Sequence, residues 1–243
     1  TEAGLRKRLA RRFSILGKEF KFSVNINRTE IGVSDRDYFH KLQFLWCYGD
    51  GSKKFANSAT KATFKEQFSG QIPDTAFTVS GWIGTVKESG DLKDGNDNLN
   101  KIIVLVRGKL AQEDILEDFN EGGMYTKYLI GEIHADFLDT DDSDDIATSS
   151  RQRLIEDDPR YISLREFVYS ELKRIQNAWT DLRNQEGEQR AMEIPAIKEW
   201  FSSLSTDNKK RAKSLFGKIN QLTLDSDVEK KRLFKHAVLA FES

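Results

Sequence analysis

Three polar side chains stand together in the stretch "DDSDDIATSSRQRLIEDD", residues 141–158: Arg151, Gln152 and Arg153. A guanidinium stays charged and offers a fixed fork of N–H donors, so an arginine in such a loop is suited to phosphate oxygens. The residues alone leave two interpretations open. Arg151 is either a surface arginine that balances the neighbouring aspartates, or an arginine held ready for a phosphate that this chain does not itself bind.

A second candidate for chemistry is the row Glu132, His134 and Asp136 in "GEIHADFLD". Side chains at every second position of a strand point to the same face, and such a row can hold a metal ion. The other histidines, His40 and His236, stand apart from it. Because one histidine gives little metal specificity, we favour the polar face of a strand over a metal site.

Nucleotide-binding motifs are missing from the sequence. A P-loop needs glycine-rich spacing that ends in Lys and Ser or Thr, and neither "VRGKL" nor "GDGSKK" satisfies it. No G-x-G-x-x-G opens a helical pattern. We therefore expect no nucleotide, cofactor or metal to be bound by this chain alone.

A basic stretch, "LRKRLARR" at residues 5–12, is the candidate for nucleic-acid contact. Its cations are Arg6, Lys7, Arg8, Arg11 and Arg12. They could bind DNA phosphates, and such binding would weaken steeply with salt. A solvated helix face explains the same residues, and we favour it on the sequence alone.

Composition indicates a globular protein with a polar surface. Of the 243 residues 38% are hydrophobic and 32% charged, and the net charge of −1 favours neither nucleic acid nor an acidic partner. One cysteine, Cys47, excludes an internal disulfide and a thiolate zinc site, and it fits the cytoplasm. No apolar run reaches the roughly 20 residues that span a bilayer, so we expect no membrane contact. The sequence begins without Met, so we expect a piece of a longer protein.

Periodicity divides the chain into a strand-rich part and a helical part. A helix is predicted at 4–12, strands at 18–31, 76–86, 101–110 and 127–139, a short helix at 111–119, and a mobile polar loop at 87–100. Phe20, Phe22, Val24 and Ile26 would share one face of the first strand, and "NINR" is typical of a hairpin turn. Phe55, Phe64 and Phe68 alternate with lysines, but core positions explain them better than nucleic-acid contacts.

The last third has the spacing of amphipathic helices. Apolar residues recur at steps of three and four over 163–184, after a predicted capping box of Ser163 and Glu166. Further helices are predicted from Pro195, around Leu215 to Leu222, and after a second capping box of Ser226 and Glu229. We therefore predict an α+β fold, with a mixed β-sheet followed by a helical C-terminal segment.

The stretch "YLIGEIHADFLD" followed by "TSSRQRL" resembles the transducer domain of GHKL ATPases, the superfamily of DNA gyrase B, MutL, MORC proteins and the ATP-dependent heat-shock chaperones. The matching positions are Gly131, Ile133, Phe137 and Leu138 in the strand, and Ser150, Arg151 and Gln152 in the loop. The opening "RRFSILGKEFKFSVNIN" also resembles the exit from the ATPase domain in bacterial members linked to restriction and phage defence. The resemblance spans roughly residues 11–165, and its motifs are short.

This resemblance implies a role for the Arg-Gln-Arg loop. In the family, the loop's cation reaches the γ-phosphate of ATP in the upstream ATP-binding domain, and by position Arg151 would do so here. Gln152 would orient a neighbouring oxygen or water. Arg153 takes the role of Arg151 if the alignment of this loop with the family's motif is shifted. The family's acidic base, magnesium-binding Asn and glycine-rich lid are missing here. The chain is therefore expected to be inactive alone, with ATP and magnesium bound by the full-length protein.

The resemblance also implies a division of the chain and its partners. Residues 1–17 would leave the ATPase domain, 18–160 would form a transducer-like domain, and 161–243 a helical extension. The partners would be the chain's own ATPase domain, a second copy when full length, and DNA or an effector protein. Two alternatives stay open: a protein-interaction module that uses the C-terminal helices, and a DNA-binding module that uses the basic N-terminus.

Overall fold

The computed structural model describes residues 1–13, 23–32, 35–94, 97–119, 124–140, 146, 154–222, 224 and 226–242. Two compact units are present, Thr1–Leu172 and Lys173–Ser243. The division at residues 17 and 160 that the resemblance implies stays a prediction. In the part of the chain that is described, no helix is both long enough and apolar enough to cross a membrane.

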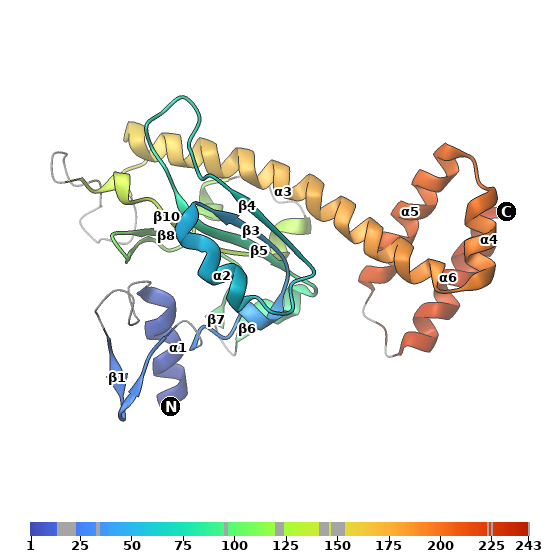
Figure 1. The fold of residues 1–243 in the computed structure, drawn as a ribbon, viewed down its shortest axis with the longest axis horizontal. Coiled ribbons are helices and arrows are strands. Elements are labelled where there is room, and N and C mark those ends of the chain that lie inside the picture. The colour runs from blue at the N-terminus through green and yellow to red at the C-terminus, as the bar shows by residue number, and fades with distance from the viewer. Residues whose placement is uncertain are drawn as a thin grey trace. The chain divides into compact units, whose positions relative to one another are not determined.

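Among the described residues of the first unit, six strands form one mixed sheet in the order β4-β3-β5-β10-β8-β9 (Figure 1). Their bounds are β3 Leu42–Tyr48, β4 Phe64–Phe68, β5 Ser80–Val86, β8 Ile102–Val106, β9 Lys109–Gln112 and β10 Leu129–His134. The pairs β3–β4 and β8–β10 are parallel, and the other neighbouring pairs are antiparallel. With the helices that follow, this sheet confirms the predicted α+β class.

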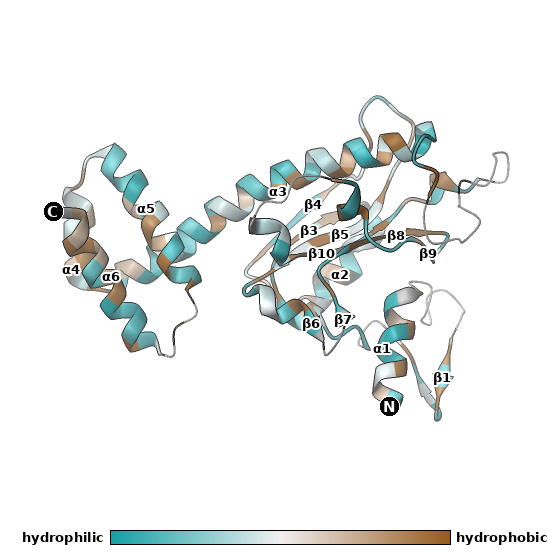
Figure 2. Cartoon of the chain, turned by 180° about the vertical axis from the view of Figure 1, so that it is seen from behind, coloured by the Kyte–Doolittle hydropathy of each residue, from teal (hydrophilic) through white to brown (hydrophobic). Residues whose placement is uncertain are grey.

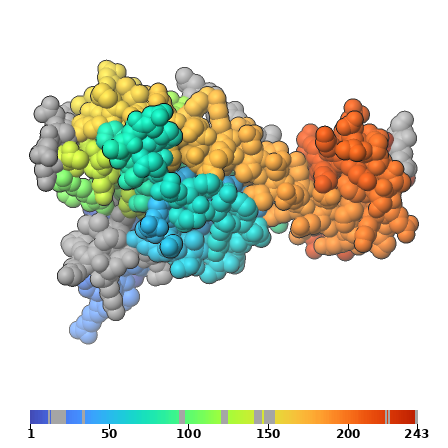
Figure 3. All heavy atoms as spheres, turned by 45° about the horizontal axis from the view of Figure 1, so that its top comes forward, coloured from blue at the N-terminus to red at the C-terminus, as the bar shows by residue number. Residues whose placement is uncertain are grey.

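Helices cover both faces of the sheet, which is why β3 is buried along its whole length. On one face lie the first turns of α3 (Pro159–Met192), where Phe167 packs against Tyr48 and Glu171 accepts a hydrogen bond from the Tyr48 hydroxyl at 2.8 Å. On the other face α2 (Lys53–Ser58) places Phe55 beside Trp82. The loop between β4 and β5 (teal) borders the first turns of α3 (yellow) on the outer surface (Figure 3).

The N-terminal helix lies on the same face as α2 (Figure 1). It is α1 (Glu2–Arg12), and it packs with the hairpin β1 (Asn25–Ile26) and β2 (Thr29–Glu30) around a small core that contains Ala10 and Ile31. Positive φ angles at the two turn residues confirm the predicted hairpin turn. Phe20 and Phe22 of the predicted strand lie outside the described residues.

Two predicted elements in the middle of the chain are wrong in detail. The run 101–110 is a hairpin rather than one strand, because Arg107 and Gly108 take positive φ angles of 48° and 74° and turn the chain from β8 into β9. As a result β9 takes the start of the predicted helix 111–119, of which only the 3₁₀ turn η6 (Ile115–Asp118) remains helical. Apolar periodicity does not reveal such a turn.

The polar segment 87–100 is structured where it is described. It holds the 3₁₀ turn η5 (Ser89–Leu92) and a ribbon of β6 (Lys93–Asp94) and β7 (Asp97–Asn98). Leu92 and Leu99 are buried in the core next to α2. The expected mobile loop is therefore wrong for these residues, because two leucines attach it to the sheet. Other 3₁₀ turns are η3 Phe39–Lys41, η4 Asp50–Ser52, η7 Met124–Tyr128 and η8 Asp136–Leu138.

The long predicted helix is confirmed but begins earlier than its capping box indicates. α3 starts at Pro159, where the Asp158 carboxylate accepts a hydrogen bond from the backbone N–H of Arg160 at 2.8 Å. Ser163 instead donates its hydroxyl to the Pro159 carbonyl inside the helix, so the box at Ser163 is wrong. Proline at the first helical position needs no N–H partner, which makes the earlier start favourable.

The second unit contains α4 (Pro195–Ser203), α5 (Thr206–Gln221) and α6 (Asp227–Glu242), as the periodicity predicts. The second capping box is confirmed by a hydrogen bond from the Glu229 N–H to the Ser226 hydroxyl. Apolar positions form stripes along these helices (Figure 2). Their core holds the aromatic rings of Trp200, Phe201, Phe216, Phe234 and Phe241.

Glycine permits a close approach between α3 and α5. A Cβ at Gly187 would lie 2.4 Å from the carbonyl oxygen of Phe216 and 2.5 Å from the backbone nitrogen of Gly217. A Cβ at Gly217 would lie 2.2 Å from the amide oxygen of Asn184. Both glycines are therefore needed for the helix spacing.

Candidate functional site

A buried ion pair joins α1 to the centre of the sheet. The Nη1 of Arg36 lies 2.7 Å from Oε2 of Glu132 on β10, and their side chains are 2% and 1% exposed. The Nε of Arg36 donates to the carbonyl oxygen of Ala10 in α1 at 2.7 Å. A buried charge is tolerated only when it is paired and hydrogen-bonded, and both conditions hold here. The pair therefore fixes where α1 lies on the sheet.

His134 extends this pair toward solvent. Its Nε2 lies 2.6 Å from Oε1 of Glu132. Burial alone would raise the pKa of Glu132, but the charge of Arg36 and the hydrogen bond from His134 outweigh it and hold that pKa below its usual value. Burial likewise tends to lower the pKa of Arg36, yet the adjacent Glu132 carboxylate raises it overall. Both groups are therefore charged at neutral pH.

The predicted polar row on this strand needs correction. Glu132 and His134 share one face, but Asp136 belongs to η8, where its carboxylate accepts a hydrogen bond from the Arg107 N–H at 2.6 Å. Glu132 is not on a solvated face, because helices cover both sides of the sheet. Within the described ranges, no group of three or more His, Cys, Asp or Glu side chains is arranged to hold a metal ion.

Several basic residues of α1 contact two aspartates on either side of Arg36. Arg6 donates from Nε and Nη2 to the two carboxylate oxygens of Asp35, each at 3.0 Å. Lys7 and Arg11 both pair with Asp37, at 2.7 and 2.6 Å. Burial would raise the pKa of Asp37, but these two cations lower it. Three of the predicted nucleic-acid contacts therefore hold α1 in place.

The remaining two cations of the basic stretch differ from these. Arg8 is exposed and lines a cavity beneath α1. The backbone of Arg12 ends α1, and its side chain lies outside the described residues. Contact of the five residues with nucleic acid stays a prediction.

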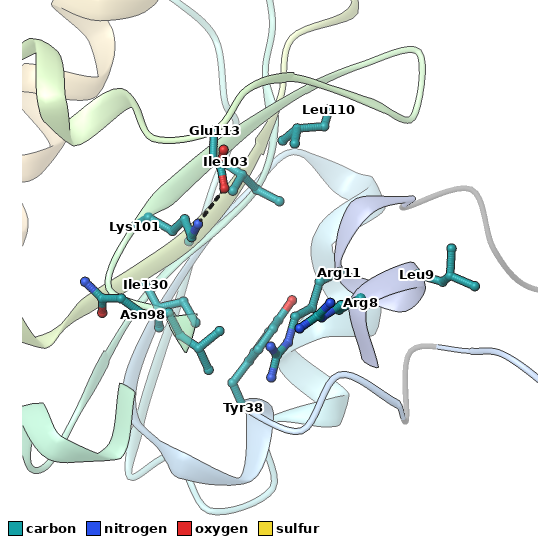
Figure 4. A pocket seen from close by; sticks show the side chains of 12 residues that line it. Arg8, Leu9, Arg11, Tyr38, Asn98, Lys101, Ile103, Leu110, Glu113 and Ile130 are labelled. Carbon is teal, nitrogen blue, oxygen red and sulfur yellow. Dashed lines mark hydrogen bonds and ion pairs between the residues drawn. The ribbon is translucent and has the colours of Figure 1, made fainter. Parts of the chain in front are cut away.

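The cavity has a volume of about 590 Å³ and lies between α1 and the sheet. Figure 4 shows Arg8, Arg11 and Tyr38 on the helix side of this space, facing Lys101 and Ile103 on the sheet side. The cavity is also lined by Asn98, Leu110, Glu113 and Ile130. Lys101 and Glu113 form an ion pair at 2.9 Å, drawn as a dashed line in Figure 4. The lining thus combines cationic, polar and aliphatic groups.

Arg151, Gln152 and Arg153 lie outside the described residues. The residues that flank them are anchored. Ile146 and Leu154 are buried, and the N–H of Ile155 donates to the Ile146 carbonyl at 2.9 Å. The N–H of Leu154 also donates to the side-chain oxygen of Gln112 at the end of β9, at 3.3 Å. Ile146 and Leu154, the described residues nearest to this stretch on either side, are therefore attached to the sheet unit.

Sequence reasoning missed the buried pair of Arg36 and Glu132, and with it the cavity. Periodicity assigns Glu132 to a polar face, since it cannot show that another segment covers the strand. One signal was present: the acid-base-acid order of Asp35, Arg36 and Asp37 complements the cations at 6, 7 and 11. Such alternation indicates ion pairs across two segments, but the partner of Arg36 comes from 96 residues further along the chain.

Comparison with known proteins gives one informative result. The chain is similar to a protein of Herpetosiphon aurantiacus named "Putative type II restriction enzyme HgiDII", with 46% identity over 188 residues. The match covers 76% of this chain but 30% of that relative, so the chain spans less than a third of the relative's length. No protein-family model matches the chain, and no solved structure matches it. The relative supports an association with restriction and defence, and the GHKL resemblance stays a prediction.

Proposed function

We propose that this chain is the transducer part of a cytoplasmic, ATP-dependent restriction enzyme of the GHKL type. The observation that carries the proposal is the 46% identity to a protein named as a restriction enzyme. The mixed sheet followed by helices agrees with the transducer fold that the sequence resemblance implies. In this proposal ATP and magnesium bind to an upstream domain, and the full-length protein is a homodimer.

Arg151 is the proposed γ-phosphate sensor. Ile146 and Leu154, on either side of it in the sequence, are fixed to the sheet unit, so a displacement at Leu154 would be transmitted to the end of β9 through its hydrogen bond with Gln112. A guanidinium beside the transferring phosphoryl group stabilises the charge that develops there. Gln152 orients the oxygen or water beside it, and Arg153 substitutes for Arg151 if the register differs.

α3 is the proposed output element. It begins at Pro159, a few residues after the loop, and its first turns are attached to the sheet unit by polar contacts. Glu171 accepts from Tyr48 at 2.8 Å, and the Leu172 carbonyl accepts from Tyr125 at 3.2 Å. ATP binding upstream would favour one position of the loop, and this bias would pass through these contacts to α3.

The test is ATP turnover by the full-length protein, wild type against Arg151→Ala, with ATP affinity measured in parallel. We expect turnover to fall about 10³-fold, the range of an arginine that contacts the transferring phosphoryl group, while ATP still binds. Arg153→Ala separates the two registers. Arg232→Ala is the matched control, because this arginine is exposed on α6, far along the chain from the loop.

Unchanged turnover in both loop variants would refute the sensor role. A full-length protein that lacks an ATP-binding domain would refute the transducer role as a whole. Loss of ATP binding together with turnover would also count against the proposal, because it would mean that Arg151 holds the nucleotide rather than the reacting group.

An interaction module is the second candidate, supported by one observation on α6. Val228 and Leu239 are 62% and 64% exposed. Eleven residues correspond to three helical turns, so the two side chains share a face. A partner helix could bury that face. The variant Val228→Lys with Leu239→Lys should then abolish partner capture by the full-length protein without changing its ATP turnover.

A further inference from the structure

The cavity beneath α1 is open to solvent on one side, so it is a surface pocket rather than an interior void. Its volume of about 590 Å³ falls within the range of small-molecule sites. The space is bounded by two elements that the buried Arg36 holds together, so it is a fixed feature of the sheet unit.

The charges of the lining favour an anion. Arg8, Arg11 and Lys101 are cationic, and Glu113 is the anionic member of the lining. Two of these cations are already paired, Lys101 with Glu113 and Arg11 with Asp37, which it shares with Lys7. Counting Lys7 and Asp37 together with the lining gives four positive and two negative charges, a net charge of +2. A phosphate monoester carries nearly two negative charges at neutral pH, whereas a carboxylate carries one. Guanidinium groups also match phosphate oxygens with two parallel hydrogen bonds.

The rest of the lining favours an apolar, planar group on the same ligand. Ile103, Leu110 and Ile130 supply aliphatic surface, and Tyr38 supplies part of an aromatic ring (Figure 4). Small-molecule sites commonly combine such apolar walls with a few polar groups that set the orientation.

The helix side of the cavity is organised before any ligand binds. Arg11 is oriented by its ion pair with Asp37 at 2.6 Å, and α1 is anchored through the Ala10 carbonyl. Side chains that are already ordered cost less entropy on binding. Arg8, one turn away on the same helix, faces the same cavity.

We propose that this cavity binds a small organic phosphate, a phosphate monoester joined to a planar ring as in a mononucleotide. Arg8 and Arg11 hold the phosphate, Lys101 adds charge from the sheet side, and the ring lies against Ile103 and Ile130. The site is independent of Arg151 and of an upstream ATP-binding domain. It is therefore a ligand site beyond the proposed transducer function.

The experiment is isothermal titration of the full 243-residue chain with AMP, adenosine and inorganic phosphate as separate probes. AMP should bind at least tenfold more tightly than either of the other two, because only AMP occupies both parts of the cavity. Arg8→Ala and Lys101→Ala should each weaken AMP binding about tenfold. Lys109→Ala is the matched control, because this exposed lysine lies on the neighbouring strand and does not line the cavity.

Two cavity-filling variants test the location. Ile103→Trp and Leu110→Trp place an indole in the space without changing any charge, and each should reduce AMP affinity at least tenfold while circular dichroism shows an unchanged fold. AMP binding no tighter than inorganic phosphate, or full AMP affinity in both tryptophan variants, would overturn the proposal. Arg151→Ala should leave AMP affinity unchanged, so this result and the ATP-turnover result can fail separately.

Discussion

Both units of this protein have aromatic cores, but their buried charges have different surroundings. The sheet unit has a buried charge network at its centre, in which Glu132 contacts Arg36 and His134. The described part of the helical unit centres on aromatic rings and on the close approach at Gly187, and the guanidinium of its buried Arg183 lies 4.2 Å from the centroid of the Trp179 ring. Apolar packing tolerates many arrangements of similar volume, whereas a buried ion pair is satisfied in one geometry. We therefore expect the charge network to fix the position of α1, and with it the shape of the cavity.

The largest effect should follow from breaking the buried pair. Glu132→Leu leaves the Arg36 guanidinium buried without its carboxylate, which should lower the free energy of unfolding by about 3–5 kcal/mol. Urea unfolding followed by the fluorescence of Trp46 and Trp82, both buried in the sheet unit, measures the change. Phe replacements of Trp179 and Trp200 remove the signal of the other unit.

The double variant Arg36→Met with Glu132→Leu separates charge from packing. Removing both charges should restore most of the stability that Glu132→Leu loses, since the uncompensated charge is the main cost. AMP affinity should be reduced in the double variant, because without Arg36 α1 is no longer anchored through Ala10. A double variant as unstable as Glu132→Leu alone would show that the pair itself, rather than the unpaired charge, provides the stability.

The next largest effect belongs to the helical unit. Alanine at Gly187 places a Cβ against the backbone of Phe216 and Gly217, so α3 and α5 must separate, and we expect a loss of about 2 kcal/mol. The sign of the change in the free energy of unfolding is diagnostic, because Gly→Ala inside a helix normally stabilises a protein by up to about 1 kcal/mol. Gly90→Ala is the control, since a Cβ there meets nothing within 4 Å. Increased stability of Gly187→Ala would refute the close approach.

The same contrast explains what the sequence could predict. The spacing of Leu172, Ile175 and Trp179 predicts a helix, because apolar residues on the buried face of a helix recur at steps of three and four within one segment of sequence. The strands at 76–86 and 127–139 were predicted too, but β3 and β4 were not assigned, and the turn at Arg107 was missed inside an apolar run. Arg36 and Glu132 were missed as a pair because burial of a charge depends on a partner distant in sequence. The Arg-Gln-Arg loop was identified from a family motif, and its role is still a prediction.

Acid should weaken the attachment of α1. The pKa of Asp37 is lowered in the folded protein, so its contribution is present above the unfolded-state value of about 3.9 and is lost as pH falls through the folded-state pKa. Asp37→Asn should cost about 1 kcal/mol at pH 7, and this cost should shrink as pH falls through the folded-state pKa. Urea unfolding of both proteins between pH 2 and 7 measures this difference. If the stability difference between the wild type and Asp37→Asn grows as pH falls, the predicted direction of the pH dependence is wrong.

The smallest effect should come from an ion pair in the helical unit that resembles the buried one in distance but not in environment. Lys213 lies 3.0 Å from Glu188, and the two side chains are 45% and 21% exposed. Water screens such a pair, so Lys213→Gln should lower the free energy of unfolding by only about 0.5 kcal/mol. In about 1 M NaCl the Debye length falls to roughly 3 Å and the loss should vanish, while the loss caused by Glu132→Leu should persist. The urea midpoints of both variants with and without salt provide the measurement. If the two variants respond equally to salt, burial is not what distinguishes the two ion pairs, and the contrast between the charge-centred sheet unit and the helical unit fails with it.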